Sequence, residues 1–316
     1  MAYQAGDTIL DDEYNAFVNN SSSPFGYNHF AGPGSGEYGL NQSTISTVSA
    51  GNTINASNWN SLFTGLDNIA NHTNVSITST SVSAGDTIAI KSALETDLAN
   101  LASAVAGGST SATAISTNAV GTSTNSGTWN STSTIERSVT FADNATMRAF
   151  FNAGGFIRID PGTSGSTDGD KDTVFEELTA AMGNVDLKAH STTRSGSGET
   201  LTTNGLSNGF HNLGTGYTVL LKLTSDNSGY TSDTLEISAK LNAAVGSATV
   251  LTIKQVAQDP ADDDTYTSPN TSGVPANPNE APAMVLALTE HFPNNTQGLA
   301  SNIQASSNAQ VSNSAS

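Results

Sequence analysis

A short unit recurs three times in the first hundred residues. Ala-Gly, then Asp or Asn, then Thr-Ile occurs at residues 5–9, 50–54 and 84–88. A glycine turn followed by apolar residues at helical spacing is typical of the start of an amphipathic helix. Small helical units of this kind expose an apolar face unless a neighbour covers it. The repeat therefore predicts helical docking units over residues 1–105.

Two of the expected helices have a clear apolar stripe. Ser57 is the expected N-cap of the helix that follows the second copy. Aromatic side chains are enriched at protein interfaces, and we therefore predict that Trp59 and Phe63 contact neighbouring subunits. The stripes comprise Trp59, Leu62, Phe63, Leu66 and Ile69 after the second copy, and Ile90, Leu94, Leu98, Leu101 and Val105 after the third.

Residues 106–134 are almost entirely Gly, Ser, Thr, Ala and Asn, with Trp129 as the one large side chain. This composition predicts an extended connector. Hydrophobic residues make up only 36% of the whole chain and charged residues only 12%, so small polar residues dominate. Such a chain cannot build one large core. We expect other subunits to complete the burial, with Trp129 as a further contact residue.

Residues 135–259 predict a compact antiparallel β-domain with two short helices. Asp143 is the expected cap of the first helix, and Gly183 ends the second. Residues 260–316 are rich in Pro, Asn and Ser and predict an extended C-terminal arm. The expected fold class is α+β and mainly β. The expected strands cover residues 138–141, 156–160, 185–190, 217–223, 235–241 and 248–256.

The charge balance excludes several classes of function. The chain has 28 acidic and 10 basic residues, a formal charge of −18. Binding to nucleic acid or to an anionic membrane requires clustered Lys and Arg, so we expect neither. The chain has no cysteine, which excludes disulfides and thiolate metal sites. No signal peptide and no membrane-spanning stretch are expected.

Two sets of residues have the spacing of known binding sites. Gly34, Gly36 and Gly39 fit the dinucleotide fingerprint, but no strand precedes them and no helix follows, so we predict a loop with special backbone dihedrals. Asp168, Asp170 and Asp172 alternate as Ca²⁺ ligands do, without the rest of a calcium loop. We favour a solvated loop in which Asp172 caps the next helix, with no metal and no other cofactor.

Arg158 alternates with Ile157 and Ile159 on an expected strand and so points away from these two apolar side chains. We predict that it pairs with a carboxylate or with carbonyl groups, either inside the domain or across a subunit boundary. It completes the set of interface candidates. The five histidines are far apart, and the common hydrolase and phosphate-binding motifs are absent, so we predict no enzymatic activity.

Several segments resemble, in the same order, a family of virion structural proteins from tailed phages, especially marine and cyanobacterial myophages. The segment at 141–159 contains Ala-Phe-Phe-Asn-Ala-Gly-Gly-Phe-Ile-Arg-Ile. The others are the Gly-rich stretch 32–42, the Gly-Asn-Thr-Ile to Trp-Asn-Ser-Leu unit at 51–62, and Asn-Gly-Phe-His-Asn-Leu at 208–213. The resemblance covers about residues 5–258. It implies a component of the phage particle and carries no catalytic residues.

The expected function is therefore a structural part of the virion. The favoured placement is the tail, in the baseplate, a fibre or the neck, with copies of the chain and other virion proteins as partners. A capsid decoration protein and an adhesin that binds a host-surface glycan are the alternatives. A hydrolase of host polysaccharide would need two carboxylates at a defined separation, which a sequence does not reveal.

Overall fold

The computed structural model describes residues 11–79, 81–83, 91–125, 129, 131–165, 170–260 and 282–316. The chain divides into two compact units. The helical unit comprises Met1–Ser116, Asp143–Gly155 and His291–Gln304. The β unit comprises Thr117–Ala142, Phe156–Glu290 and Ala305–Ser316. The chain passes from one unit to the other several times, so these boundaries do not coincide with those expected from the sequence.

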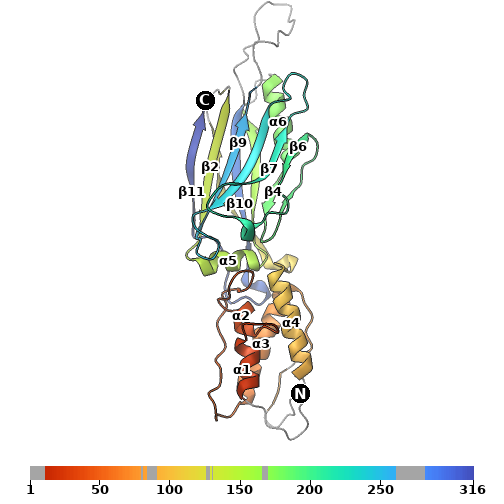
Figure 1. The fold of residues 1–316 in the computed structure, drawn as a ribbon, viewed down its shortest axis with the longest axis vertical. Coiled ribbons are helices and arrows are strands. Elements are labelled where there is room, and N and C mark those ends of the chain that lie inside the picture. The colour runs from red at the N-terminus through yellow and green to blue at the C-terminus, as the bar shows by residue number, and fades with distance from the viewer. Residues whose placement is uncertain are drawn as a thin grey trace, which may run out of the picture. The chain divides into compact units, whose positions relative to one another are not determined.

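The helical unit contains the segments that follow the sequence repeats. The helix α3 begins after Asn55, whose backbone is extended and whose N–H donates to Asn58 Oδ1 at 2.9 Å. Ser57 lies inside the helix, so its prediction as the N-cap was wrong. In the described ranges no helix is long and apolar enough to cross a bilayer. The elements are α1 (Asp11–Asn19), α2 (Tyr27–Phe30), α3 (Ala56–Thr73), α4 (Lys91–Ala106), η1 (Ala112–Ala114), α5 (Asn144–Asn152) and η4 (Asn295–Gln297) (Figure 1).

The described apolar residues of α3 and α4 form the core of the helical unit, which confirms the predicted helices, and Ile90 lies outside the described residues. Tyr14 of α1 meets Trp59 of α3 edge to face, with ring centroids 5.2 Å apart. These rings lie eight residues after the glycines of the first two repeat copies. The copies therefore cover each other's apolar faces inside one chain. Leu94, Leu98 and Leu101 of α4 are also fully buried.

The β unit holds two antiparallel sheets, which confirms the mainly β, α+β fold. One sheet has the order β1-β10-β3-β4-β5, and the other β11-β2-β9-β8-β7-β6. The helix α6 (Asp170–Met182) packs on β3, β7 and β8. The remaining elements are β1 (Ile115–Thr124), β2 (Thr132–Thr140), β3 (Phe156–Ser164), β4 (Val185–Leu187), β5 (Thr192–Arg194), β6 (Thr200–Asn204), η2 (Phe210–Asn212), β7 (Thr218–Thr224), β8 (Thr234–Leu241), β9 (Val250–Gln258), β10 (Ala283–Pro293) and β11 (Ser307–Ala315).

Two segments that were expected to be extended and unpaired are strands instead. The expected connector contains β1, and the expected C-terminal arm contributes β10 and β11. In β10, Met284, Leu286 and Leu288 are buried at every second position, so this strand supplies apolar side chains to the core. Apolar residues that recur with a period of two are typical of a half-buried strand, so the prediction of an extended arm was wrong for these residues. In β1 and β11, backbone pairing replaces the apolar burial that the composition lacks.

Candidate functional site

The three aromatic residues predicted at subunit contacts are buried inside the chain. Trp59, Phe63 and Trp129 are 2%, 4% and 2% exposed. Trp129 Nε1 donates to the Pro282 carbonyl at 3.0 Å, and its ring lies 4.8 Å from that of Phe175. The prediction that these side chains contact neighbours is therefore wrong. In a chain with so few large apolar residues, the available ones fill its own two cores.

Arg158 pairs with a carboxylate inside the β unit. It lies opposite Asp186 in the β3–β4 register, and Nε and Nη2 donate to the two carboxylate oxygens at 2.8 and 3.0 Å. This two-fold hydrogen bond raises the pKa of Arg158. Asp160 follows on the same side of β3, where burial raises the pKa of its carboxyl group. The expected pairing is confirmed, and the partner belongs to the same chain.

The acidic segment does not assemble a metal site among the described residues. Asp168 and the side chain of Asp170 lie outside them. Asp172 is 1% exposed and lies within the first turn of α6, which begins at Asp170, so it is not the helix cap. Beside it, Lys171 Nζ donates to Asp259 Oδ2 at 2.6 Å, and both side chains are buried. Within the described ranges no three His, Asp or Glu side chains are grouped for a metal ion.

The glycine-rich loop is a structural joint. Gly34, Gly36 and Gly39 have φ values of +52°, +58° and +101°, as the sequence predicted. Arg148 Nη2 donates to the carbonyls of Pro33 and Gly34.

A second residue of α5, Asn152, donates from Nδ2 to the carbonyls of Gly36 and Gly39 at 3.4 and 3.3 Å. One face of α5 therefore holds a loop more than a hundred residues earlier in the sequence. Arg148 and Asn152 were not predicted as contact residues, although their four-residue spacing is a signal that they share a helix face.

Asparagine side chains hold extended backbone elsewhere in the helical unit. Asn15 donates to the Val48 carbonyl and accepts from the Val48 N–H, both at 2.8 Å. Asn60 makes the same pair of bonds with Val82, both at 2.9 Å. Asn15 and Asn60 occupy the same position in the first two repeat copies, nine residues after the glycine. Each side-chain amide thus makes the two hydrogen bonds that a neighbouring β-strand residue would make. This role was not predicted from the sequence.

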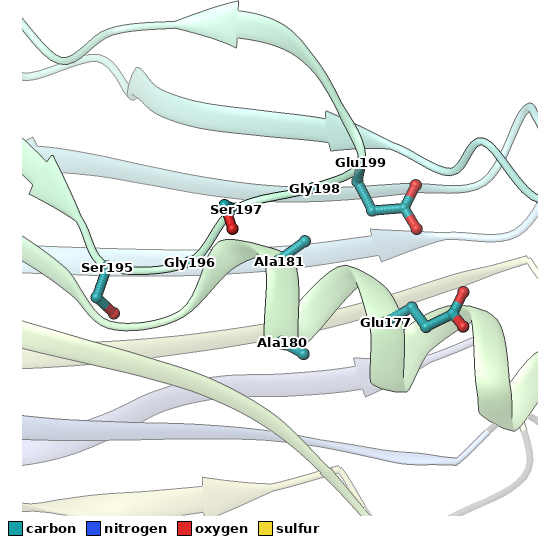
Figure 2. Close-up of a pocket in the computed structure, with 8 residues that line it drawn as sticks. All are labelled: Glu177, Ala180, Ala181, Ser195, Gly196, Ser197, Gly198 and Glu199. Atoms are coloured by element: carbon teal, nitrogen blue, oxygen red, sulfur yellow. The ribbon is translucent and has the colours of Figure 1, made fainter.

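The β unit has an open pocket of about 430 Å³ between α6 and residues 195–199 (Figure 2). A close backbone approach shapes it, because a Cβ atom at Gly196 would lie only 2.2 Å from the Ala181 carbonyl oxygen. Small residues therefore form most of the wall. The lining comprises Glu177, Ala180, Ala181, Ser195, Gly196, Ser197, Gly198 and Glu199.

Two carboxylates give this pocket its chemistry. Glu177 Oε2 accepts from Asn227 Nδ2, and Glu199 Oε2 accepts from the Asp226 N–H, both at 2.7 Å. Burial raises the pKa of Glu199. The hydrogen bond from the Asp226 N–H opposes this effect, and the charges of Asp226 and Glu177 add to it. The lining holds no aromatic ring, histidine or cysteine. The pocket can accept hydrogen bonds, but its lining offers no ring on which a sugar could stack.

The most unusual surface is the edge strand β11. It lies at the end of its sheet beside β2, and every residue of it except Asn313 is exposed (Figure 1). Its sequence contains no charged residue and no proline, which are common means of blocking strand pairing at a sheet edge. Val311, 54% exposed, lies where the β11–β2 register shifts. We take β11 and its partner β2 as the candidate assembly site.

Comparisons with protein-family models, with curated proteins and with solved structures find no match to this chain. Its function is therefore argued from its own residues.

Proposed function

We propose that this chain is a structural component of a tailed-phage virion, associated with the tail, that acts by assembling with copies of itself and by docking to neighbouring virion proteins. The observation that carries the proposal is the ordered series of motifs between residues 5 and 258 that resembles virion structural proteins.

The contacts made by these motifs support that role. Two of them, 32–42 and 141–159, touch each other through Arg148 and Asn152. A third, 208–213, forms a turn in which the Asn208 carbonyl accepts from Thr192 Oγ1 at 2.7 Å and the Phe210 N–H donates to the Lys188 carbonyl at 2.8 Å. In each case the motif joins backbone segments. The motifs therefore serve the packing of this chain, which fits a structural role.

The test is to locate the chain on purified particles. Antibodies against the recombinant chain, visualised with gold, are expected to label the tail, and densitometry is expected to give a copy number typical of tail parts. Labelling over the whole head with hundreds of copies would replace the tail placement by capsid decoration. Failure to detect the chain in purified virions by mass spectrometry would overturn the proposal.

A further inference from the structure

The strand β11 adds almost nothing to the apolar core. Its side chains are Ser, Asn, Gln and Ala apart from Val311, which is exposed. In the other strands of this sheet, by contrast, residues such as Ile135, Ile237 and Ile253 are fully buried. Hydrophobic burial is the main stabilising contribution to a fold. The β unit therefore does not require its own β11 to fill its core.

Polar contacts hold β11 in place. Ser316 donates its N–H to the Thr132 carbonyl at 3.0 Å and accepts the Ser131 N–H at 2.8 Å. Asn313 Nδ2 donates to the Thr124 carbonyl at 2.8 Å. Each such bond adds about 1 kcal/mol net, because water replaces it when the strand leaves. An identical strand from another copy would restore every one of these bonds.

The contact with Arg137 makes the β2 edge selective for this strand. Arg137 is 5% exposed, and its Nη2 donates to Asn308 Oδ1 of β11 at 3.1 Å. Its Nη1 donates to Ser123 Oγ at 2.6 Å, and among the described residues its Nε has no hydrogen-bond partner. A buried guanidinium that loses an acceptor is destabilising. A strand without an asparagine at this register position would leave Arg137 with fewer acceptors.

The chain also changes unit immediately before β11. Residues up to Gln304 belong to the helical unit, where Ile303 is buried and donates its N–H to the Pro293 carbonyl. From Ala305 onward the chain belongs to the β unit, and Ala305 N–H donates to the buried Glu290 carboxylate. The chain would therefore turn between Gln304 and Ala305 if β11 left, because Ser306 already donates to the Thr140 carbonyl of β2. Short hinges of this kind favour strand exchange between copies.

We propose that β11 is an exchangeable strand, and that in the assembled state it pairs with β2 of a second copy of this chain. The occupant is a second copy because the β2 edge fits Asn308 and the polar bonds of this one sequence. This inference rests on the proposed assembly role, which brings copies to high local concentration. Exchange of an identical element is a low-cost route to oligomers because no new interface has to be built.

Engineered cysteines test the exchange directly, because the chain has none of its own. Ala309 of β11 lies opposite Ser138 of β2. Two full-length variants, Ala309→Cys and Ser138→Cys, are mixed, concentrated and oxidised, and non-reducing gels and peptide mass spectrometry identify the bonds. Exchange predicts a 309–138 disulfide between chains that increases with protein concentration. The matched control is Thr134→Cys, which lies on the same side of β2 but opposite Ser314.

The geometry of a disulfide makes this comparison strict. Cross-linking of position 309 to 138 is expected to exceed that to 134 by about tenfold or more, because opposed strand residues satisfy the required Cα separation and the control does not. Equal yields for the two mixtures would overturn the exchange. So would the double variant Ala309→Cys/Ser138→Cys if it formed only bonds within a chain at every concentration and on particles. Tail labelling combined with bonds only within a chain would retain the proposed function and reject the exchange. Bonds between chains in a protein that is absent from purified virions would support the exchange and reject the proposed function.

Discussion

The helical unit and the β unit satisfy their extended backbone in different ways. In the β unit, strands pair with strands, as in the complete register of β2 with β9. In the helical unit, the extended residues Ile45, Val48 and Val82 bond to side-chain amides of helices instead. A chain rich in asparagine can therefore keep extended segments in place without a sheet. Each unit has a separate core, with one tryptophan in each.

Substitutions of the two tryptophans give the largest expected effects and test whether the two units unfold separately. Trp59→Ala removes a buried ring from the core of the helical unit and is expected to destabilise that unit by about 3–5 kcal/mol. Trp129 is then the only tryptophan and reports on the β unit. Its fluorescence transition in urea is expected to stay unchanged, while loss of helical circular dichroism moves to lower urea.

The reciprocal variant Trp129→Ala is the matched control. It should shift the β unit and leave the transition reported by Trp59 in place. If either substitution moves both transitions equally, the two units unfold as one, and the contrast between them does not extend to stability.

The asparagine clips, which are the bonds of Asn15 to Val48 and of Asn60 to Val82, are the next test, with a smaller effect. Asn60→Ala leaves the N–H and carbonyl of Val82 without their partners, which is expected to destabilise the helical unit by about 1–2 kcal/mol. Asn71→Ala, on the exposed side of the same helix, is the control and should change stability by less than about 0.5 kcal/mol. Urea unfolding followed by Trp59 fluorescence in a Trp129→Phe background measures both. Equal stability of the two variants would mean that water replaces the clip without loss.

The two units also differ in how much of their structure the sequence predicts. Periodicity identified α3, α4, α6 and the central strands, because apolar residues recur on one side of each. It failed for β1 and β11, since an edge strand of Ser, Thr and Asn carries no apolar alternation. The partner of such an edge strand is far away in the sequence, so no local pattern indicates it. The clips and the α5–loop joint were missed for a related reason, because a polar side chain bonded to distant backbone leaves no local pattern.

The pairing of Arg158 with a carboxylate was predicted correctly, as were the special backbone dihedrals of Gly34, Gly36 and Gly39, but the sequence did not identify Asp186 as the partner. A charged residue between two isoleucines on a strand limits the possible partners to the same side of the sheet, and a carboxylate lay directly opposite. The pocket could not have been foreseen. It depends on Gly196 approaching the end of α6, a contact between segments whose sequences show only small residues.

The smallest predicted effect concerns Asp160, on the same side of β3 as Arg158. Burial raises the pKa of its carboxyl group, the Asp186 charge raises it further, and Arg158 opposes them. The folded chain therefore binds this proton more tightly than the unfolded chain. The resulting stabilisation is full below the unfolded pKa, near 3.8, and is lost as the pH rises through the folded pKa. At pH 7 the ionised carboxylate therefore destabilises the folded β unit.

Asp160→Asn removes this partly buried charge. The variant is therefore expected to be more stable than the parent at pH 7, and the difference should disappear toward pH 3.5. The gain should be below about 1 kcal/mol, because the group is only half-buried and water screens its charge. Urea unfolding of the β unit at a series of pH values, followed by Trp129 fluorescence in a Trp59→Phe background, measures the difference. A variant less stable than the parent at pH 7 would show that attraction to Arg158 outweighs burial, and that the Arg158–Asp186 pair needs the second carboxylate beside it.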